Sequence, residues 1–323
     1  MDVSKTKQKR KGIHNRGIIK DIRDNKFSYL IALPAVIYVL IYSYFTYPYM
    51  VIAFQRYNYQ NNTILDILFR GNWIGLDNFK FFFESNQASR VMFNTLFLNI
   101  LFITFGTFTA VTLAILVSEM RWRKLAKASQ SVMLFPNYIS WVIVSFILMS
   151  FLSTEHGLVN KALTTLGFDR VNWYTDAKYW RPILVMLNVW KGAGMSSVIY
   201  LAAIAGIDTA LYEVAMIDGA SHWQRIKYIT LPMITPTILI LTLLAVGKIM
   251  YGDFGMIYAL VGDNGTLYRT TDIIDTYIFR SLRQVGDPAQ SMAIGLFQSV
   301  IGFIMVFGSN AIVRKVYPDG ALY

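Results

Sequence analysis

Long stretches without charge constrain this chain more than any other feature. Four windows contain no Asp, Glu, Lys or Arg: 28–54, 91–118, 128–154 and 288–313. Two more, 182–207 and 232–252, each carry one interior lysine, Lys191 and Lys248. Because a helix that crosses a bilayer needs about 20 consecutive apolar residues, the six windows predict six membrane spans. Charged residues make up only 15% of the chain, well below the share usual in soluble domains, so we expect an all-α integral membrane protein.

The basic residues between these windows predict the orientation of the spans. Residues 1–27, 119–127, 208–227 and 314–323 hold 17 Lys and Arg in 66 positions, whereas the alternate connections hold 11 in 97. Cytoplasmic loops carry an excess of these residues, so we expect both termini to be cytoplasmic. The net charge of +11 then reflects topology and does not indicate a nucleic-acid partner.

This reasoning divides the chain into three parts. They are a basic cytoplasmic segment (1–27), a six-span transmembrane domain (28–313) and a cytoplasmic tail (314–323).

Several classes of site are excluded by the residues that are missing. The chain has no cysteine, and its three histidines, His14, His156 and His222, are too scattered to suggest a metal site. Gly247-Lys248 is not a phosphate-binding loop, because Thr242 stands where such a loop needs its first glycine and Ile249 where it needs a hydroxyl. We therefore expect no catalytic residue, no metal and no cofactor bound by this chain.

The fourth connection, 208–232, is polar although both of its neighbours are apolar. Thr209 can cap a first helix, Gly219 can end it, and Ser221 with Gln224 has the spacing of a capping box that starts a second helix. Pro232 then opens the fifth span. We expect a helix–turn–helix on the cytoplasmic face that presents apolar side chains and two carboxylates; the alternative is an ordinary loop with an interfacial helix.

A second short helix is predicted between the fifth and sixth spans. In 271–282 the apolar residues Ile273, Ile274, Tyr277 and Ile278 recur at helical spacing. We expect this helix to lie along the outer surface.

The fourth connection also carries a pattern that spans most of its length. Glu213, Ala215, Gly219, Ile229, Leu231 and Pro232 fit E-x-A-x3-G-x9-I-x-L-P, with Asp218-Gly219-Ala220 at its centre. The pattern resembles the signature cytoplasmic loop of permease subunits in binding-protein-dependent ABC importers. Val214 replaces the usual alanine and Ile226 a frequent phenylalanine, and both changes stay apolar. Further segments resemble the oligosaccharide and polysaccharide-fragment subgroup on the maltose-permease side of that family: 134–148, 157–163, 190–208, 271–282 and 293–306.

The resemblance implies a fold, a location and a set of partners. The fold is the type I ABC importer permease fold, in the bacterial cytoplasmic membrane. The partners are a second homologous permease, two ATPase subunits that hold ATP and Mg²⁺, an extracytoplasmic solute-binding protein, an oligosaccharide and membrane lipid. The loop would couple the spans to an ATPase through Leu211, Glu213, Ala215, Asp218, Gly219, Ala220, Trp223, Ile226, Leu231 and Pro232. Glu213 and Asp218 would engage the ATPase or brace the loop, and Trp223 could instead anchor the membrane interface.

Polar and aromatic residues inside the spans are candidates for a substrate path. They are Asn137, Tyr138, Trp141, Asn188, Trp190, Lys191, Ser196, Ser197, Tyr200, Lys248, Tyr251 and Asp253. The alternative for each is helix packing, and Lys191 can be structural whatever the cargo. Two lysines at membrane depth also suggest an acidic sugar such as a uronate oligomer, whose carboxylates would offset the cost of burying ammonium groups. An ABC importer for a non-sugar solute and a stand-alone secondary transporter are the competing functions.

Overall fold

The computed structural model describes residues 21, 24–58, 63–284 and 286–316. The predicted N-terminal segment 1–27 and tail 314–323 lie largely outside this part of the chain. The described residues form two compact units, one drawn from 1–52 and 58–72 and the other from 53–57 and 73–323. Two-residue strands, β1 (Gln55–Arg56) and β2 (Asn72–Trp73), stand near the points where the chain passes between the units.

The first unit is dominated by apolar helix. Helix α2 (Lys26–Val39) continues through a π-helical turn, η1 (Leu40–Tyr44), towards a 3-10 stretch, η2 (Tyr47–Phe54), and a short helix α3 (Ile64–Arg70) follows. None of the residues of α2 is buried, although most are apolar. An apolar helix without a polar face is typical of a membrane span, and Lys26–Phe54 is long enough to be the first one.

Four long helices of the second unit correspond to the second, fourth, fifth and sixth predicted windows. They are α5 (Ala88–Ser118), α9 (Trp180–Ala205), the helix that ends in α12 (Leu231–Val246), and α16 (Pro288–Val316). Helix α5 packs along α9, and α12 packs against α16. Each is long and apolar enough to cross a membrane.

The third predicted window is not one straight helix. It forms α6 (Arg123–Tyr138) and α7 (Trp141–Leu152), which meet at an angle of 93°. Ser140 begins the second of them, because its side chain accepts a hydrogen bond from the Ile143 backbone N–H. Together with the five long helices, this bent pair gives up to six spans, as the sequence predicts.

The fifth window also differs from its predicted bounds. The helix begins at His222 as α11 (His222–Arg225), passes through a π-helical turn, η4 (Ile226–Thr230), and runs without a break into α12. Pro232 therefore does not open the span, because the wider π-helical turn before it lets the helix continue past a residue that cannot donate a hydrogen bond. The helix ends at Val246, so Lys248 and Gly252 lie in a non-helical segment.

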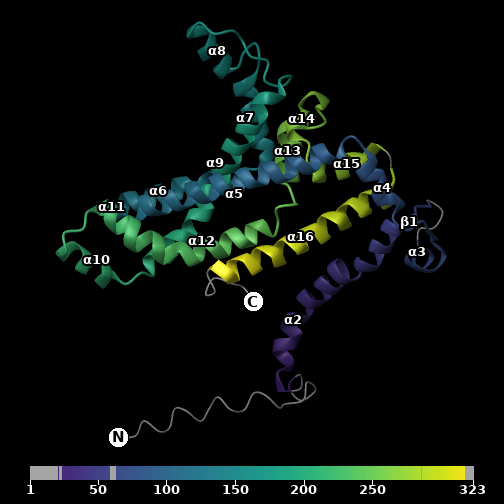
Figure 1. Cartoon of the computed structure of the whole chain (residues 1–323), viewed down its shortest axis with the longest axis horizontal. Helices are drawn as coiled ribbons and strands as arrows, with labels where there is room; N and C mark the ends of the chain where they lie inside the picture. The colour runs from purple at the N-terminus through teal and green to yellow at the C-terminus, as the bar shows by residue number, and fades with distance from the viewer. Residues whose placement is uncertain (1–20, 22–23, 59–62, 285, 317–323) are drawn as a thin grey trace. The chain divides into compact units, whose positions relative to one another are not determined.

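Short elements complete the second unit. They are α4 (Asp77–Glu84), α8 (Leu158–Thr165), η3 (Ala177–Tyr179), α10 (Thr209–Ile217), α13 (Phe254–Val261), η5 (Gly265–Leu267), α14 (Tyr268–Thr271) and α15 (Ile274–Gln284). Figure 1 shows α10 and α11 at one end of the long helices and α13 to α15 towards the other.

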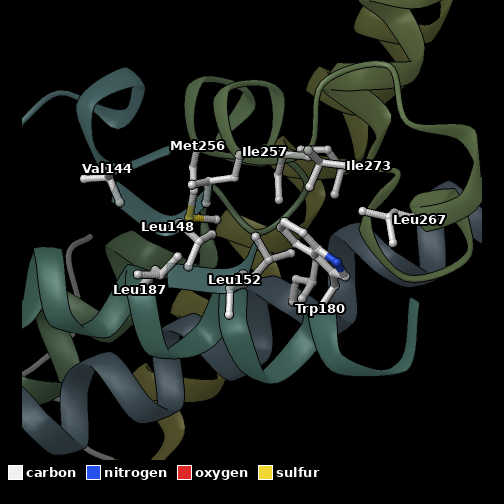
Figure 2. Packing of buried hydrophobic residues seen from close by; sticks show 13 residues of the cluster. Val144, Leu148, Leu152, Trp180, Leu187, Met256, Ile257, Leu267 and Ile273 are labelled. Atoms are coloured by element: carbon white, nitrogen blue, oxygen red, sulfur yellow. The ribbon is translucent and has the colours of Figure 1, made fainter. Parts of the chain in front are cut away.

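The short helix predicted between the fifth and sixth spans is present as α15, and it begins three residues later than expected. Ile274 and Tyr277 are buried against α4, α5 and α16 residues, whereas Ile273 precedes the helix and joins a different cluster. That cluster gathers α7, α9 and α13 around Trp180, Leu148 and Met256 (Figure 2).

One glycine sets the distance between two helices. A side chain at Gly194 of α9 would overlap the backbone carbonyl of Met133 on α6. Small residues let membrane helices approach closely, so Gly194 allows α6 to lie directly against α9.

Candidate functional site

The loop that follows α9 has a well-defined first helix. Asp208, and not Thr209 as predicted, is the N-cap of α10, because its carboxylate accepts from the Ala210 N–H at 3.0 Å. The helix ends at Ile217 with Asp218 as its C-cap, and Gly219 follows with a φ of +77°, in the left-handed region that glycine adopts most easily. The Gly219 N–H bonds to the Met216 carbonyl and the Ala220 N–H to the Ala215 carbonyl. These two bonds form a Schellman motif, which fixes the direction in which the chain leaves α10.

The second helix starts where the capping box predicts. The Ser221 hydroxyl accepts from the Gln224 N–H, and the Gln224 side chain accepts from the Ser221 N–H at 2.7 Å. Because α11 continues into α12, Trp223, Ile226, Leu231 and Pro232 all belong to one helix with the fifth span. A displacement of this part of the loop therefore acts directly on that span.

Two side-chain contacts brace the loop against the long helices. The hydroxyls of Tyr212 and Thr230 lie 2.9 Å apart and join α10 to the π-helical turn. His222 Nδ1 lies 3.0 Å from Glu119 Oε2, next to the last residue of α5. Tyr212 and Glu119 are not in the predicted coupling set. The sequence does not reveal their contacts, because their partners are 18 and 103 residues away. The first contact fixes α10 against the helix that becomes the fifth span, and the second fixes α11 against the end of α5.

The loop leaves apolar side chains exposed. Leu211, predicted to pack on a partner, is 45% exposed and Trp223 is 69% exposed. Met216 and Ile217, which the prediction omits, are 52% and 85% exposed. Ala215, Ala220, Ile226 and Leu231 are half-buried. Exposed apolar groups gathered on one short helix indicate an interaction surface.

Both predicted carboxylates of the loop are accessible. Glu213 and Asp218 are exposed, and neither makes an ion pair within the described residues. Each is free to meet a basic group of another subunit.

Lys191 meets backbone carbonyls at the bend between α6 and α7. Its ammonium donates to the carbonyls of Pro136 at 3.3 Å, Asn137 at 2.7 Å and Ile139 at 2.7 Å. These carbonyls stand at the C-terminal end of α6, where the helix runs out of N–H donors and where the helix dipole favours a cation. The Pro136 carbonyl also accepts from the Ile139 N–H at 3.2 Å. An ammonium has three N–H donors, and the three carbonyls at the bend can accept from all of them.

The same bend is tied to α13. Trp141, the first residue of α7, lies under the Lys191 ammonium at 5.3 Å, and its indole N–H donates to Asp253 Oδ2 at 3.1 Å. Asp253 is the N-cap of α13, accepting from the Met256 N–H, and Asn188 of α9 contacts Met256 Sδ at 3.9 Å. Four of the predicted path residues, Trp141, Asn188, Lys191 and Asp253, are thus brought together.

The segment between α12 and α13 keeps a few turn-type backbone bonds, such as that from the Tyr251 N–H to the Lys248 carbonyl, and side chains of other helices bond to further polar groups of its backbone. Asn99 of α5 donates to the carbonyls of Ile249 and Tyr251, and Gln298 of α16 donates to the Met250 carbonyl. Asp275 of α15 accepts from the Gly252 N–H at 2.7 Å. Irregular backbone at membrane depth is tolerated only where its polar groups are satisfied in this way. The prediction missed these supporting residues because they lie on three other helices; within the window 232–252 the available signal for the helix end was Gly247, the C-cap of α12.

Asp275 is a half-buried carboxylate beside this segment. Burial raises its pKa above the ordinary 3.8, the bonds from Gly252 and Gln298 act in the opposite direction, and the Asp253 charge adds a small further rise. Lys248 and Tyr251 on the segment are exposed; the Tyr251 hydroxyl lies 2.8 Å from that of Ser299.

The remaining path candidates do not share one site. Asn188, Ser196 and Tyr200 line a cavity of about 330 Å³ between α5, α9 and α12. Ser197 is buried and bonds to the Gly194 carbonyl, and Trp190 faces a different groove. Asn137 is half-buried and Tyr138 is 77% exposed. Among the described residues, no group of three or more His, Asp or Glu is placed to hold a metal.

The chain is similar to known transport proteins over nearly its whole length. It is 33% identical to the polygalacturonan/rhamnogalacturonan transport system permease protein YteP of Bacillus subtilis, over 97% of this chain and 94% of that one. A crystal structure of a bacterial ABC transporter involved in import of the acidic polysaccharide alginate contains a chain that is 37% identical, with a TM-score of 0.82; 93% of this chain and 99% of that one are covered.

A second structure, of a bacterial alginate ABC transporter in complex with an alginate pentasaccharide-bound periplasmic protein, gives 36% identity and a TM-score of 0.81. It covers 93% of this chain and 98% of that one. Residues 103–317 match the family described as the binding-protein-dependent transport system inner membrane component. The match takes in the bent third span, the loop after α9 and the broken segment before α13. The chain is therefore a multi-pass membrane protein and a permease subunit that belongs to the family of inner membrane components of binding-protein-dependent transport systems.

Proposed function

We propose that this chain is a permease subunit of an ATP-driven importer for acidic oligosaccharides. The observation that carries the proposal is α10, a capped and braced helix that exposes apolar side chains and continues through one turn into the fifth span. Such a helix can receive a push from another subunit and pass it to the bundle without bending.

The motor is a separate ATPase in this proposal. The chain has no phosphate-binding loop, so two ATPase subunits would hold ATP and Mg²⁺. Leu211, Met216 and Ile217 would enter an apolar cleft on one of them, and Glu213 and Asp218 would pair with its basic groups. ATP binding closes the ATPases, the two coupling loops approach each other, and the spans open outward; hydrolysis resets them.

The proposed importer function also implies two further protein partners. A second, homologous permease completes the pathway, and a solute-binding protein delivers the cargo on the side opposite α10. The alginate transporter in complex with a sugar-bound periplasmic protein supports this arrangement.

The cargo class rests on the relatives and on one side chain. Alginate and polygalacturonan are polymers of uronic acids, and the chains named for them are 33–37% identical to this one. Lys248 is exposed on the broken segment, where its ammonium can meet a carboxylate. Lys191 is engaged with backbone carbonyls, so it contributes less to this argument than the sequence suggests.

Uptake of uronic and neutral oligosaccharides of equal length, measured with the assembled transporter in vesicles, tests the cargo class. We expect uronic oligomers to be taken up preferentially and Lys248→Met to reduce that preference. Lys161→Met, which removes an exposed charge from α8, is the matched control. Faster uptake of neutral sugars together with no effect of Lys248→Met would contradict the cargo, and purification without a nucleotide-binding subunit would contradict the motor.

A further inference from the structure

A long groove runs between α5 and α9, with a volume of about 770 Å³. Its α5 wall is formed by Phe97, Leu101 and Phe105, which stand four residues apart and so share one helix face. Its α9 wall includes Val185, Met186 and Trp190. Met186 and Trp190 are 61% and 46% exposed, so the groove is open along its length.

The polar groups of the groove gather at one end. Lys178 and Arg181 line the end opposite α10, and the rest of the wall is almost entirely apolar. Lys178 is compensated, because its ammonium lies 2.8 Å from Asp176 Oδ2. Arg181 is the group that gives the end its charge.

Arg181 has no carboxylate partner in the part of the chain that the structure describes. One guanidinium nitrogen donates to Asn94 Oδ1 at 2.9 Å, and the group lies over the Phe97 ring at 4.9 Å. Its Nε is buried and makes no hydrogen bond with the described residues.

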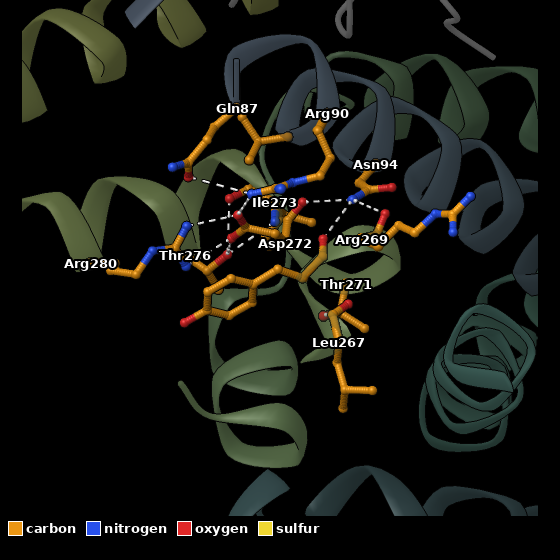
Figure 3. A network of polar contacts seen from close by, with 12 residues as sticks. Gln87, Arg90, Asn94, Leu267, Arg269, Thr271, Asp272, Ile273, Thr276 and Arg280 are labelled. Atoms are coloured by element: carbon orange, nitrogen blue, oxygen red, sulfur yellow. Dashed lines mark hydrogen bonds and ion pairs between the residues drawn. The ribbon is translucent and has the colours of Figure 1, made fainter. Parts of the chain in front are cut away.

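The neighbouring acid is already occupied. Asp272 accepts two bonds from Arg280, at 3.1 and 2.7 Å, and a third from Arg90 (Figure 3). An arginine held in place by a ring and an amide, with donors to spare, can bind an anion such as phosphate.

The dimensions of the groove fit one leaflet of a bilayer. The span Ala177–Ala205 has 29 residues, and at 1.5 Å per residue it is about 44 Å long, the thickness of a bilayer with its headgroups. Arg181 then lies at headgroup depth. From Arg181 to Trp190 the helix rises by about 14 Å, close to half of the hydrocarbon core of about 30 Å.

We propose that this groove binds an anionic phospholipid, with the phosphate on Arg181 and an acyl chain along the face of Phe97, Leu101 and Phe105. A sugar is a poor occupant, because it would need hydrogen-bonding groups along its length and the walls offer almost none. A helix of another subunit would fill the apolar part but would leave the Arg181 charge uncompensated. Of the earlier conclusions, the proposal requires only that the chain lies in a membrane. It is therefore independent of the proposed cargo.

Native mass spectrometry of the purified, assembled transporter tests the proposal, with phosphatidylglycerol and phosphatidylcholine titrated separately. We expect the wild type to retain phosphatidylglycerol preferentially and Arg181→Gln to bind it about fivefold more weakly, the change expected from one basic residue at a membrane surface. Arg170→Gln, which removes an exposed arginine shortly before α9, is the matched control and should leave binding unchanged.

A second variant tests the apolar part. Leu101→Trp fills the middle of the groove and should reduce retention of both lipids, while co-purification of the other subunits reports that the bundle is intact. Equal retention of the two lipids by the wild type, equal effects of Arg181→Gln and Arg170→Gln, or unchanged retention in Leu101→Trp would each overturn the proposal. Displacement of phosphatidylglycerol by a uronate oligomer would assign the cationic end to cargo, and retention only after the second permease is stripped away would assign the groove to that subunit.

Discussion

The ammonium of Lys191 shows how a single residue can hold a helix bend inside a membrane bundle. The sequence marks Lys191 as an intramembrane cation, but it does not reveal the partner, because the window 128–154 reads as one uninterrupted apolar span. The bend supplies three carbonyls at or just beyond the C-terminal end of α6, where helical N–H donors run out. Pro136 and Ser140 were the available signals, one as a residue that cannot donate and the other as an N-cap.

Replacing Lys191 with methionine should destabilise the protein. The variant keeps the apolar stem and removes the donors, and a hydrogen bond to a charged group contributes about 1.5–3 kcal/mol. We expect thermal unfolding in detergent to occur at a clearly lower temperature. Lys248→Met, which removes an exposed ammonium, is the control and should leave the midpoint unchanged. An unchanged midpoint in Lys191→Met, with loss of uronate uptake, would instead assign the ammonium to cargo.

Asp275 makes stability depend on pH. Because burial raises its pKa, the folded protein holds this proton more tightly than the unfolded chain does. Its charge therefore costs stability above the folded-state pKa, and the cost disappears as the pH falls below the unfolded value. Asparagine keeps an oxygen that can accept from Gly252 and Gln298. We expect Asp275→Asn to raise the unfolding midpoint at neutral and alkaline pH, with a gain that shrinks as the pH is lowered.

Asp176 provides a control of opposite sign. The Lys178 ammonium lowers the pKa of this exposed carboxyl, so its charged form is the favoured one in the folded protein. Asp176→Asn should give no gain at any pH. A gain in Asp275→Asn that is constant across the pH range would rule out titration of Asp275 as its cause.

At the scale of elements, the loop after α9 is the part that the sequence predicts best. Gly219, Ser221 and Gln224 act as predicted because caps depend on neighbouring residues. The tertiary support beyond the end of α12 was not predictable, because the side chains that bond to this backbone, Asn99 and Gln298 as donors and Asp275 as an acceptor, come from three other helices. Sequence patterns report local preferences, whereas a break inside the bundle depends on tertiary contacts.

Gly219→Ala should weaken coupling and leave global stability almost unchanged. A Cβ at Gly219 meets nothing within 4 Å, so the cost is confined to the positive φ, about 1–2 kcal/mol. That strain favours loss of the Schellman bonds and a different angle of α10. We expect lower transport-coupled ATP hydrolysis at an unchanged unfolding midpoint.

Gly167→Ala is the matched control for this substitution. Gly167 also has a positive φ, +87°, and open space around it, but it lies in the connection after α8. The same backbone strain is thus placed in a connection that is not part of the loop after α9. Equal losses of coupling in the two variants would show that strain anywhere, and not the geometry of α10, causes the effect.

At the scale of the whole molecule, the number of spans follows from composition, and their packing does not. Windows free of charge predict the six segments because the cost of placing charge in lipid acts on every residue separately. The packing of α5 along α9, and of α6 against Gly194, depends on shape and small residues at particular positions. The orientation follows from charge bias alone, so it needs a test of its own.

The natural absence of cysteine makes that test direct, because each variant carries a single thiol. Met216→Cys on α10 and Leu166→Cys beyond α8 replace side chains that are 52% and 73% exposed. With both termini cytoplasmic, a membrane-impermeant maleimide added to intact cells should label Leu166→Cys and spare Met216→Cys, and permeabilised cells should show both labelled. In the proposed mechanism the ATPases act from the cytoplasm, so α10 must face it if the helix is to receive their motion. The reverse labelling would place α10 outside the cell and would refute both the orientation and the proposed coupling.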